Sequence, residues 1–230
     1  MEAFERTIRM IGEDAQSRLL RARVAVVGLG GVGGYVVEGL VRAGVGHLLL
    51  VDGDVVEESN LNRQILATRD TIGRPKSEVC RLRALSINEN ADIDARHVFY
   101  DETTCGQFDF SRYDFVVDAI DTLSSKLLLI RRARASGARV ISCMGAGNKL
   151  DPSRFQIADI EKTSVCPLAR RVRQALRKDG VEGVTCLFST EPPVVPTGEG
   201  RAPGSISFVP SVAGLLIAGH VIRTLIGETV

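Results

Sequence analysis

The chain has 230 residues, of which 44% are hydrophobic and 25% are charged. These values are ordinary for a soluble globular protein and exclude a mainly disordered chain, and the length is sufficient for one large domain. Lysine and arginine number 29 against 28 for aspartate and glutamate, and the net charge of +1 excludes a domain that binds nucleic acid by bulk positive charge alone. Because 24 of the 29 basic residues are arginine, a local basic patch is still compatible with this total.

The five cysteines are scattered along the chain and form no C-x-x-C pair. This spacing argues against a structural zinc site and against a disulfide framework, so we expect a reducing compartment. The first 16 residues lack the continuous apolar core of a secretory signal. The longest apolar stretch, residues 208–218, contains Pro210 and is too short to cross a bilayer. We therefore expect a cytoplasmic protein with no stable membrane insertion.

Strands and helices alternate along the first 150 residues. Short apolar runs indicate buried strands at residues 23–27, 47–51, 113–117 and 139–143, with a further extended segment at residues 93–99. Apolar residues at helical spacing predict helices over residues 31–43, 77–87 and 122–136. This alternation implies βαβ units, and we expect an α/β fold with a Rossmann-like, doubly wound, mostly parallel sheet.

The pattern changes after about residue 150. Two further strands are predicted at residues 155–160 and 185–189, on either side of a helix over residues 167–178. Residues 191–204 are rich in proline and glycine and predict a loop or flap, and an apolar helix follows over residues 209–226. We expect a single domain over residues 1–230. Its nucleotide-binding core would span about residues 20–150, and residues 151–230 would form an elaborated C-terminal half that faces the substrate or a second subunit.

Residues 28–33 match the G-x-G-x-x-G pattern at Gly28, Gly30 and Gly33. The motif follows a predicted strand and opens a predicted helix, and in that context backbone N–H groups and the helix N-terminus bind phosphates. Asp52 ends the next strand, where a ribose-binding carboxylate belongs. The alternative is a glycine turn needed only for close packing, which this context makes the weaker interpretation. We therefore expect a nucleotide site, and the motif alone leaves open whether the nucleotide is a dinucleotide.

Charged residues beyond this unit favour a nucleoside triphosphate. A nicotinamide-dependent enzyme needs one acid for the ribose, whereas Arg63 and Lys76 supply a bidentate and a mobile cation for phosphates. Asp118 and Asp121 follow a predicted strand at its carboxyl end, where ligands bind in open α/β sheets, and a carboxylate there suits Mg²⁺. Taken singly, these residues would as often be helix caps or solvated surface charges. Their combination in this order favours a site for a nucleoside triphosphate with Mg²⁺.

The order of these motifs resembles a known superfamily. Residues 4–12 (FERTIRMIG) are followed by GLGGVGG, VDGD, SNLNRQ, GRPK and DAIDT, and this series is similar to the ThiF/MoeB/HesA superfamily, relatives of ubiquitin-activating enzymes. The resemblance covers about residues 4–190 and implies one adenylating domain that activates a carboxylate with ATP and Mg²⁺. Arg6 matches the arginine that this superfamily offers to the ATP of the partner subunit, with Arg9 as the second choice, which implies a homodimer.

The same resemblance implies roles for individual residues. Gly28, Gly30, Gly31 and Gly33 would form the phosphate loop, with Gly30 and Gly31 facing the phosphates, and Asp52 would bind the ribose. The triphosphate would be lined by Asp54, Asn60, Arg63, Gln64 and Lys76, and Asp121 would hold Mg²⁺ and support the reaction. Arg6, Arg63, Lys76 and the metal ion would offset the charge that builds at the α-phosphate in the transition state.

Three later segments resemble one branch of the superfamily. Residues 145–152, 183–192 and 207–214 look like those of the tRNA threonylcarbamoyladenosine dehydratases, and the paired cysteines of zinc-holding members are absent. The resemblance implies a tRNA substrate whose threonyl carboxylate is adenylated next to the anticodon. An internal nucleophile of the same side chain would then displace AMP, with net loss of water and with the help of proximity.

Three alternatives stay open at this point. The first is an enzyme that adenylates the C-terminus of a ubiquitin-like sulfur-carrier protein. The second is a nicotinamide-dependent oxidoreductase, and the third is an adaptor that binds ATP without catalysis. A sulfur-handling or redox protein partner is also compatible with the sequence.

Two further groups of residues are candidates for function. Cys186 matches a cysteine of this branch and is the candidate for a covalent nucleophile, although a small buried hydrophobic residue is the simpler interpretation. Arg170, Arg173 and Arg177 fall on one polar face of the predicted helix 167–178, and we expect them to contact tRNA phosphates. Basic helical faces are usually only solvated surfaces, and with 5% aromatic residues the chain has few platforms for base stacking. The histidines, His47, His97 and His220, have no ligand-spaced partners and are interpreted as structural.

Overall fold

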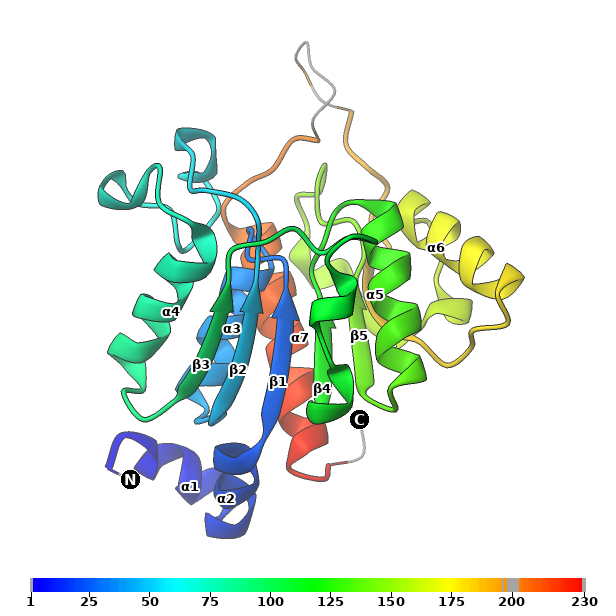
Figure 1. Ribbon diagram of the computed structural model, residues 1–230. Coiled ribbons are helices and arrows are strands. Elements are labelled where there is room, and N and C mark those ends of the chain that lie inside the picture. Colours follow the sequence, from blue (N-terminus) through cyan, green and yellow to red (C-terminus); the bar gives the residue numbers. More distant parts are fainter. Residues whose placement is uncertain (1, 196, 198–202, 229–230) are drawn as a thin grey trace.

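The computed structural model describes residues 2–195, 197 and 203–228, and it is built around a seven-stranded sheet (Figure 1). The strand order is β3-β2-β1-β4-β5-β7-β6, and neighbouring strands are parallel except for β6 and β7. The strands are β1 (Arg23–Val27), β2 (His47–Val51), β3 (Asp92–Arg96), β4 (Phe115–Asp118), β5 (Arg139–Cys143), β6 (Phe155–Asp159) and β7 (Thr185–Ser189). The predicted Rossmann-like, mostly parallel sheet is confirmed, and β7 and β6 extend it with the C-terminal half of the chain.

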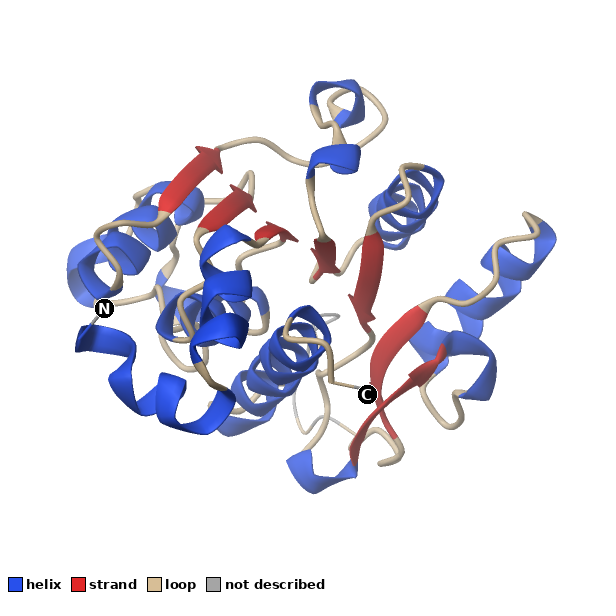
Figure 2. Cartoon of the chain, turned by 90° about the horizontal axis from the view of Figure 1, so that it is seen from below, coloured by secondary structure: helices blue, strands red, loops and turns tan. Residues whose placement is uncertain are grey.

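Helices cover both faces of the sheet (Figure 2). They are α1 (Glu5–Ile11), α2 (Glu13–Arg21), α3 (Gly33–Arg42), α4 (Lys76–Ile87), α5 (Leu123–Ala135), α6 (Pro167–Lys178) and α7 (Phe208–Leu225). Short 3-10 turns are η1 (Glu2–Phe4), η2 (Glu58–Asn60), η3 (Arg69–Thr71), η4 (Cys105–Gln107), η5 (Phe110–Arg112), η6 (Pro152–Arg154) and η7 (Ile160–Lys162). Successive residues of a strand point to opposite faces, so Val24 and Val26 pack under α3, α4 and α7, while Ala25 and Val27 pack under α5 and α6.

Most predicted boundaries agree with the structure to within about two residues. The extended segment predicted to residue 99 ends as a strand at Arg96, and α3 begins at Gly33 because Gly30, Gly31 and Val32 form the turn before it. The sequence analysis did not predict α1 and α2. Their helical signal is weak because α1 has no buried residue and each helix is shorter than ten residues.

The apolar helix α7 packs along α3. A Cβ atom at Gly39 of α3 would lie 2.6 Å from the Cβ of Ala218, and one at Gly214 of α7 would lie 2.4 Å from the carbonyl oxygen of Val32. Glycine therefore lets the two helices approach closely at both points. By length and composition alone, α7 is also long and apolar enough to cross a membrane. Among the described residues it is the single helix that meets these two criteria.

The carboxyl ends of the parallel strands share one edge of the sheet, at the top in Figure 1. After β1 the chain continues to β2 on one side, and after β4 it continues to β5 on the other side. The strand order therefore reverses between the neighbours β1 and β4. Ligands of open α/β sheets bind at such a reversal. Helices α1 and α2 lie at the opposite edge, where Ala22 leads from α2 into the start of β1 (Figure 1).

Candidate active site

The glycine loop after β1 accepts no side chain at two of its positions. Gly28 has a φ of +91°, and a Cβ atom there would lie 2.6 Å from the carbonyl oxygen of Ala119. A Cβ at Gly33 would lie 1.8 Å from the carbonyl oxygen of Gly28, which is far inside contact distance. At Gly30, by contrast, the nearest atom to such a Cβ would be a side-chain nitrogen 3.8 Å away. The loop is therefore closely packed at both ends and open at Gly30, while a Cβ at Gly31 would lie 3.2 Å from the Cβ of Pro210. Backbone N–H groups in such a turn can bind phosphates.

Asp52, at the end of β2, holds this loop in place. Its two carboxylate oxygens accept the backbone N–H groups of Leu29 at 2.6 Å and of Asp54 at 2.8 Å. Burial raises the pKa of Asp52, and these two hydrogen bonds and the charge of Lys76 oppose that rise. The predicted ribose-binding carboxylate thus lies directly beside the glycine loop.

Lys76 and Asp54 form an ion pair beside the loop. Lys76 begins α4, its Nζ lies 3.0 Å from a carboxylate oxygen of Asp54, and its backbone N–H donates to the carbonyl oxygen of Asp54 at 3.0 Å. The lysine side chain is 7% exposed and that of Asp54 is 54% exposed. The lysine side chain is therefore almost fully buried, and its ammonium group is paired with a carboxylate that is half exposed.

The turn around η2 carries three of the predicted residues, and two of them, Arg63 and Gln64, lie beside the glycine loop. Asn60 is buried and its Oδ1 accepts the backbone N–H of Glu57 at 3.1 Å, which shapes the turn. Arg63 donates to the carbonyl oxygen of Ser59 at 2.8 Å, and its Cγ would lie 3.5 Å from a Cβ at Gly31. Gln64 is buried beside Gly30, and its Oε1 has no hydrogen-bond partner among the described residues.

The structure separates the two aspartates of the Asp118–Asp121 segment. Asp118 is fully buried and forms an ion pair with the Nζ of Lys126 at 2.7 Å. That Nζ also donates to the carbonyl oxygen of Cys143 at 2.9 Å and to the Ser142 hydroxyl at 3.3 Å. Asp118 is therefore part of the protein interior and is not available to a metal ion, which corrects the interpretation of it as a ligand-binding carboxylate.

Sequence reasoning missed Lys126, although a signal was present. Lys126 is followed at helical spacing by Leu129, Ile130 and Ala133, all of them fully buried, so it lies on the apolar stripe of α5. A lysine in that position needs a buried partner.

Asp121 lies in the loop between β4 and α5 with an exposed side chain. One oxygen accepts the hydroxyl of Thr122 at 3.3 Å. Within the described residues, no three or more His, Cys, Asp or Glu side chains are grouped so as to hold a metal ion. Asp121 thus offers a single carboxylate at the same edge of the sheet as the glycine loop.

A later segment crosses over this edge from the β5 side to the Arg63 turn. Asn148 donates its backbone N–H to the carbonyl oxygen of Gly204 at 2.8 Å, and its Oδ1 accepts the N–H of Gly204 at 2.6 Å. Asn62, next to Arg63, donates to the carbonyl oxygen of Ser205 at 3.0 Å. The predicted flap 191–204 therefore begins and ends at the candidate site, while residue 196 and residues 198–202 lie outside the described residues.

Arg6 is not part of the site in its own chain. It is exposed on α1, at the edge of the sheet opposite the glycine loop (Figure 1). Arg9, the second choice, forms an ion pair with Glu5 on the same helix.

Cys186 lies in the interior of the sheet. It is fully buried on β7, in register with Ser142 of β5 and Ala158 of β6, and burial raises the pKa of its thiol to about 12. Only the thiolate is a nucleophile, so a thiol in this state is inert at neutral pH. This geometry corrects the interpretation of Cys186 as a covalent nucleophile and favours the structural one.

The structure divides the three arginines expected on α6. Arg177 forms an ion pair with Glu161, and Arg173 donates to the carbonyl oxygen of Thr163 at 2.9 Å. Arg170 is exposed and has no side-chain partner among the described residues. The arginines of one predicted face therefore have different surroundings.

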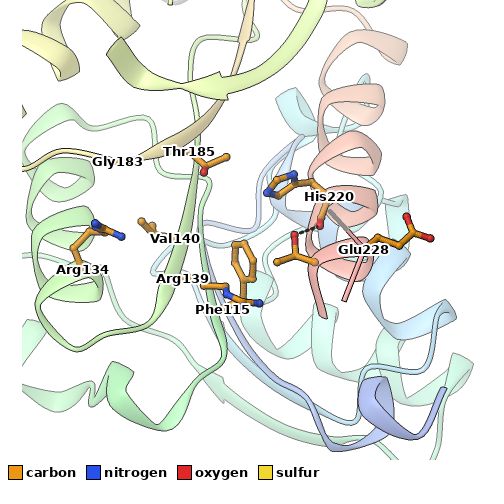
Figure 3. Close-up of a pocket in the computed structure, with 9 residues that line it drawn as sticks. Phe115, Arg134, Arg139, Val140, Gly183, Thr185, His220 and Glu228 are labelled. Carbon is orange, nitrogen blue, oxygen red and sulfur yellow. Dashed lines mark hydrogen bonds between the residues drawn. The ribbon is translucent and has the colours of Figure 1, made fainter. Parts of the chain in front are cut away.

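A hollow of about 220 Å³ lies at the amino ends of β4, β5 and β7 (Figure 3). Phe115, Arg139, Thr185 and His220 line it, and burial together with the charge of Arg223 lowers the pKa of His220. This hollow is at the edge opposite the glycine loop, so it is separate from the nucleotide site. The other histidines have local partners: His47 contacts Asp92 at 3.0 Å, and His97 contacts the carbonyl oxygen of Gly53 at 3.0 Å.

Comparisons with known proteins identify the family of this chain. Residues 4–230 match the ThiF family. A tRNA threonylcarbamoyladenosine dehydratase of Bacillus subtilis is 42% identical to this chain, over 99% of this chain and 96% of the relative. The crystal structure of the E. coli enzyme of that name, TcdA, in complex with ATP is 34% identical, has a TM-score of 0.91, and is matched over 97% of this chain and 93% of the other. A sulfur carrier protein adenylyltransferase of Thermus thermophilus is 32% identical, over 94% of this chain and 74% of the relative. The chain therefore belongs to the ThiF family.

Proposed function

We propose that this chain catalyses the ATP-dependent cyclodehydration of threonylcarbamoyladenosine next to the anticodon of a tRNA. The observation that carries the proposal is the gathering of the glycine loop, Asp52, Arg63, Lys76 and Asp121 at one edge of the sheet. The high identity to dehydratases of that name over nearly the full length supports the substrate. We further propose that the chain acts as one domain, in solution in the cytoplasm.

ATP fits this edge for reasons that the structure supplies. The phosphates would lie over Gly30 and Gly31, since Gly28 and Gly33 fix the two ends of the loop. The ribose hydroxyls would donate to Asp52, which follows β2 and lies directly beside the glycine loop. Lys76 would exchange part of its contact with Asp54 for phosphate oxygens. The remaining contacts in this proposal come from Asn60, Arg63 and Gln64.

The residues present also fit Mg²⁺. This ion is usually held by one or two carboxylates together with substrate phosphates and waters. Asp121 provides one exposed carboxylate on the phosphate side of the sheet, and Asp118 is excluded by its ion pair with Lys126. Bound there, the ion would neutralise charge on the phosphates.

The chemistry follows from the poor electrophilicity of a carboxylate. The threonyl carboxylate oxygen attacks the α-phosphorus of ATP, the bond to the bridging oxygen breaks, and pyrophosphate leaves. A nucleophile of the same side chain then attacks the acyl adenylate, closes the ring and releases AMP. Arg63 and Lys76 oppose the charge that develops on the phosphorus oxygens, and the second step is accelerated because it is intramolecular.

The proposal includes a homodimer in which Arg6 acts on the ATP of the partner. Arg6 lies at the opposite edge of the sheet, so it can serve only a site in another subunit. Helix α7 supports an interface between subunits because Phe208, Leu215 and Leu216 are 40% or more exposed on it. Mixing Arg6→Ala with Asp121→Ala chains tests this arrangement. Each variant alone is expected to be inactive, and the mixture should recover about one quarter of wild-type activity, because half of the dimers then contain one intact site.

The activity is tested by incubating the protein with ATP, Mg²⁺ and tRNA that carries threonylcarbamoyladenosine, followed by mass spectrometry of the nucleosides. The expected result is loss of the mass of one water from that nucleoside, with one AMP formed per product, and neither with Lys76→Ala. An unchanged nucleoside would refute the proposal. ATP–pyrophosphate exchange that depends on a ubiquitin-like carrier protein and not on tRNA would select the alternative, which rests on the 32% identical adenylyltransferase.

A further inference from the structure

A hollow of about 570 Å³ lies where the chain enters α6. It is lined by the loop residues Ser164, Val165, Cys166 and Pro167 and by the helix residues Arg170, Arg171, Arg173 and Gln174. Its lining therefore combines guanidinium groups from one helix face with a short apolar wall from the preceding loop. None of these residues belongs to the nucleotide site described above.

Two arginines give this hollow its charge. Arg170 and Arg171 are exposed, and neither side chain has a hydrogen-bond or ion-pair partner among the described residues. The third, Arg173, is held at the rim because it donates to the carbonyl oxygen of Thr163 at 2.9 Å. Helix α6 contains no acidic residue, so these positive charges are not neutralised along their own helix.

The apolar wall is formed by a strained residue. Val165 has a φ of +61°, and the N–H of Cys166 donates across it to the carbonyl oxygen of Ser164 at 2.6 Å, which closes a γ-turn. A β-branched residue is a rare occupant of the left-handed region. The side chain of Val165 is also 52% exposed, so burial does not explain its presence there. The turn presents an aliphatic surface at the mouth of the hollow.

The hollow lies beside the segment that follows the carboxyl end of β5. The Sγ of Cys166 would lie 4.0 Å from a Cβ at Gly145, two residues beyond the carboxyl end of β5. In the sheet β5 pairs with β4, whose end leads to Asp121. Asp121 and the hollow thus follow the carboxyl ends of two neighbouring strands. A nucleotide chain could therefore place one nucleotide at Asp121 and the adjacent nucleotide in the hollow.

From these observations we infer that the hollow binds a nucleotide of the anticodon loop beside the modified adenosine. Arg170 and Arg171 contact its phosphates, and Val165 packs against its base or ribose. Single-stranded loops are the RNA elements whose bases are free for such contacts, and arginine holds phosphate oxygens bidentately. This inference rests on the proposed function, because it assumes that a tRNA anticodon loop is the substrate.

The test compares two doubly substituted proteins. Arg170→Ala/Arg171→Ala removes the charges of the hollow, and Arg21→Ala/Arg112→Ala removes two exposed arginines from the opposite edge as a control for total charge. The substrates are the modified tRNA and a modified anticodon stem–loop. For the hollow variant we expect KM for both RNAs to rise about 10- to 100-fold, with kcat and the KM for ATP unchanged. The dependence of log KM on log salt should also weaken by about 1 to 1.5.

A second variant, Val165→Gly, separates binding from folding. Glycine accepts the positive φ without strain, so a purely structural role predicts no loss of stability and no change in KM. We expect an unchanged or higher Tm together with a KM for the stem–loop that rises about 3-fold or more, as loss of an apolar contact implies.

The outcomes keep the two proposals apart. The inference is overturned if the hollow variant behaves like the control, or if it weakens binding of the full tRNA and not of the stem–loop. If the wild-type protein does not modify the tRNA, the proposed function fails. Direct binding of unmodified stem–loop RNA then tests the inference. Equal affinity of the wild type and the hollow variant refutes it, and weaker affinity of the variant supports it.

Discussion

The buried ion pair between Lys126 and Asp118 provides the sharpest test of the fold. We consider Lys126→Met, which keeps an unbranched chain of similar length and removes only the ammonium group. In the wild type this group has an acceptor for each of its protons, namely Asp118 at 2.7 Å, the Cys143 carbonyl oxygen at 2.9 Å and the Ser142 hydroxyl at 3.3 Å. In the variant, Asp118 keeps only the Ser142 hydroxyl and the N–H of Ile120, and it stays fully buried.

The expected cost follows from that geometry. Removing one partner of a buried pair leaves an uncompensated charge and destabilises a protein by about 3–5 kcal/mol. For a domain of this size each kcal/mol lowers Tm by about 2–4 °C, so Lys126→Met should lower Tm by about 6–20 °C. The double variant Asp118→Asn/Lys126→Met removes both charges. It should be less destabilised than Lys126→Met alone, because no unpaired charge is left in the interior.

Calorimetry and urea denaturation of the protein without ligand measure these values. The control is Lys162→Met, an exposed lysine of η7, for which we expect a change within about 0.5 kcal/mol. A Tm loss below about 2 °C for Lys126→Met would show that the ammonium group does not stabilise the interior. A double variant less stable than Lys126→Met would contradict the unpaired-charge argument, because Asp118 would then stabilise the protein independently of Lys126.

Three further predictions concern other parts of the chain. Gly33→Ala places a Cβ 1.8 Å from the Gly28 carbonyl oxygen, so we expect loss of ATP binding by calorimetric titration and about 1–3 kcal/mol of destabilisation, whereas Gly106→Ala, in open space, should change neither. Cys186→Ala should keep kcat within about 2-fold in the nucleoside assay, because the thiol is buried and its pKa is raised to about 12; a loss of 100-fold would restore the nucleophile hypothesis. Burial and the charge of Arg223 lower the pKa of His220 below 6.5. As the pH falls below 6.5, the unfolded chain therefore binds a proton at His220 more readily than the folded chain does. Urea midpoints should therefore fall as the pH drops through 6.5, and His220→Gln should reduce this fall; equal slopes would contradict the assignment.

The fold was largely predictable because its signals are local. Strands such as Arg23–Val27 and His47–Val51 are buried on both faces and appear as continuous apolar runs, and their boundaries coincide with the predicted ones. Helices α1 and α2 gave no such signal, since their places depend on contacts with distant chain. Gln16 donates to the carbonyl oxygen of Ala43 at 3.0 Å, for example, and Arg18 donates to that of Ile226 at 2.6 Å.

The candidate site was predictable in its motifs and less so in its roles. The glycine loop and Asp52 adjoin one another as the spacing implied, because both follow neighbouring parallel strands. The two aspartates of the Asp118–Asp121 segment look equivalent in sequence. They differ because the buried partner of Asp118, Lys126, comes from the apolar stripe of the following helix. A prediction made from sequence motifs does not include Lys126, because its role as the partner of Asp118 depends on its burial in the folded protein.

Pairing also determines how the net charge of +1 relates to binding. The total counts charges, whereas binding depends on which charges lack partners. Arg131 and Arg177 form ion pairs with Asp179 and Glu161, while Arg170 and Arg171 have no such partner in the described part of the chain. Pairs of this kind add little stability, yet they remove positive charge from a surface. Under the proposed function, we expect RNA binding with few phosphate contacts and a shallow salt dependence. Its specificity must then come from the modified nucleotide in the active site and its immediate neighbours.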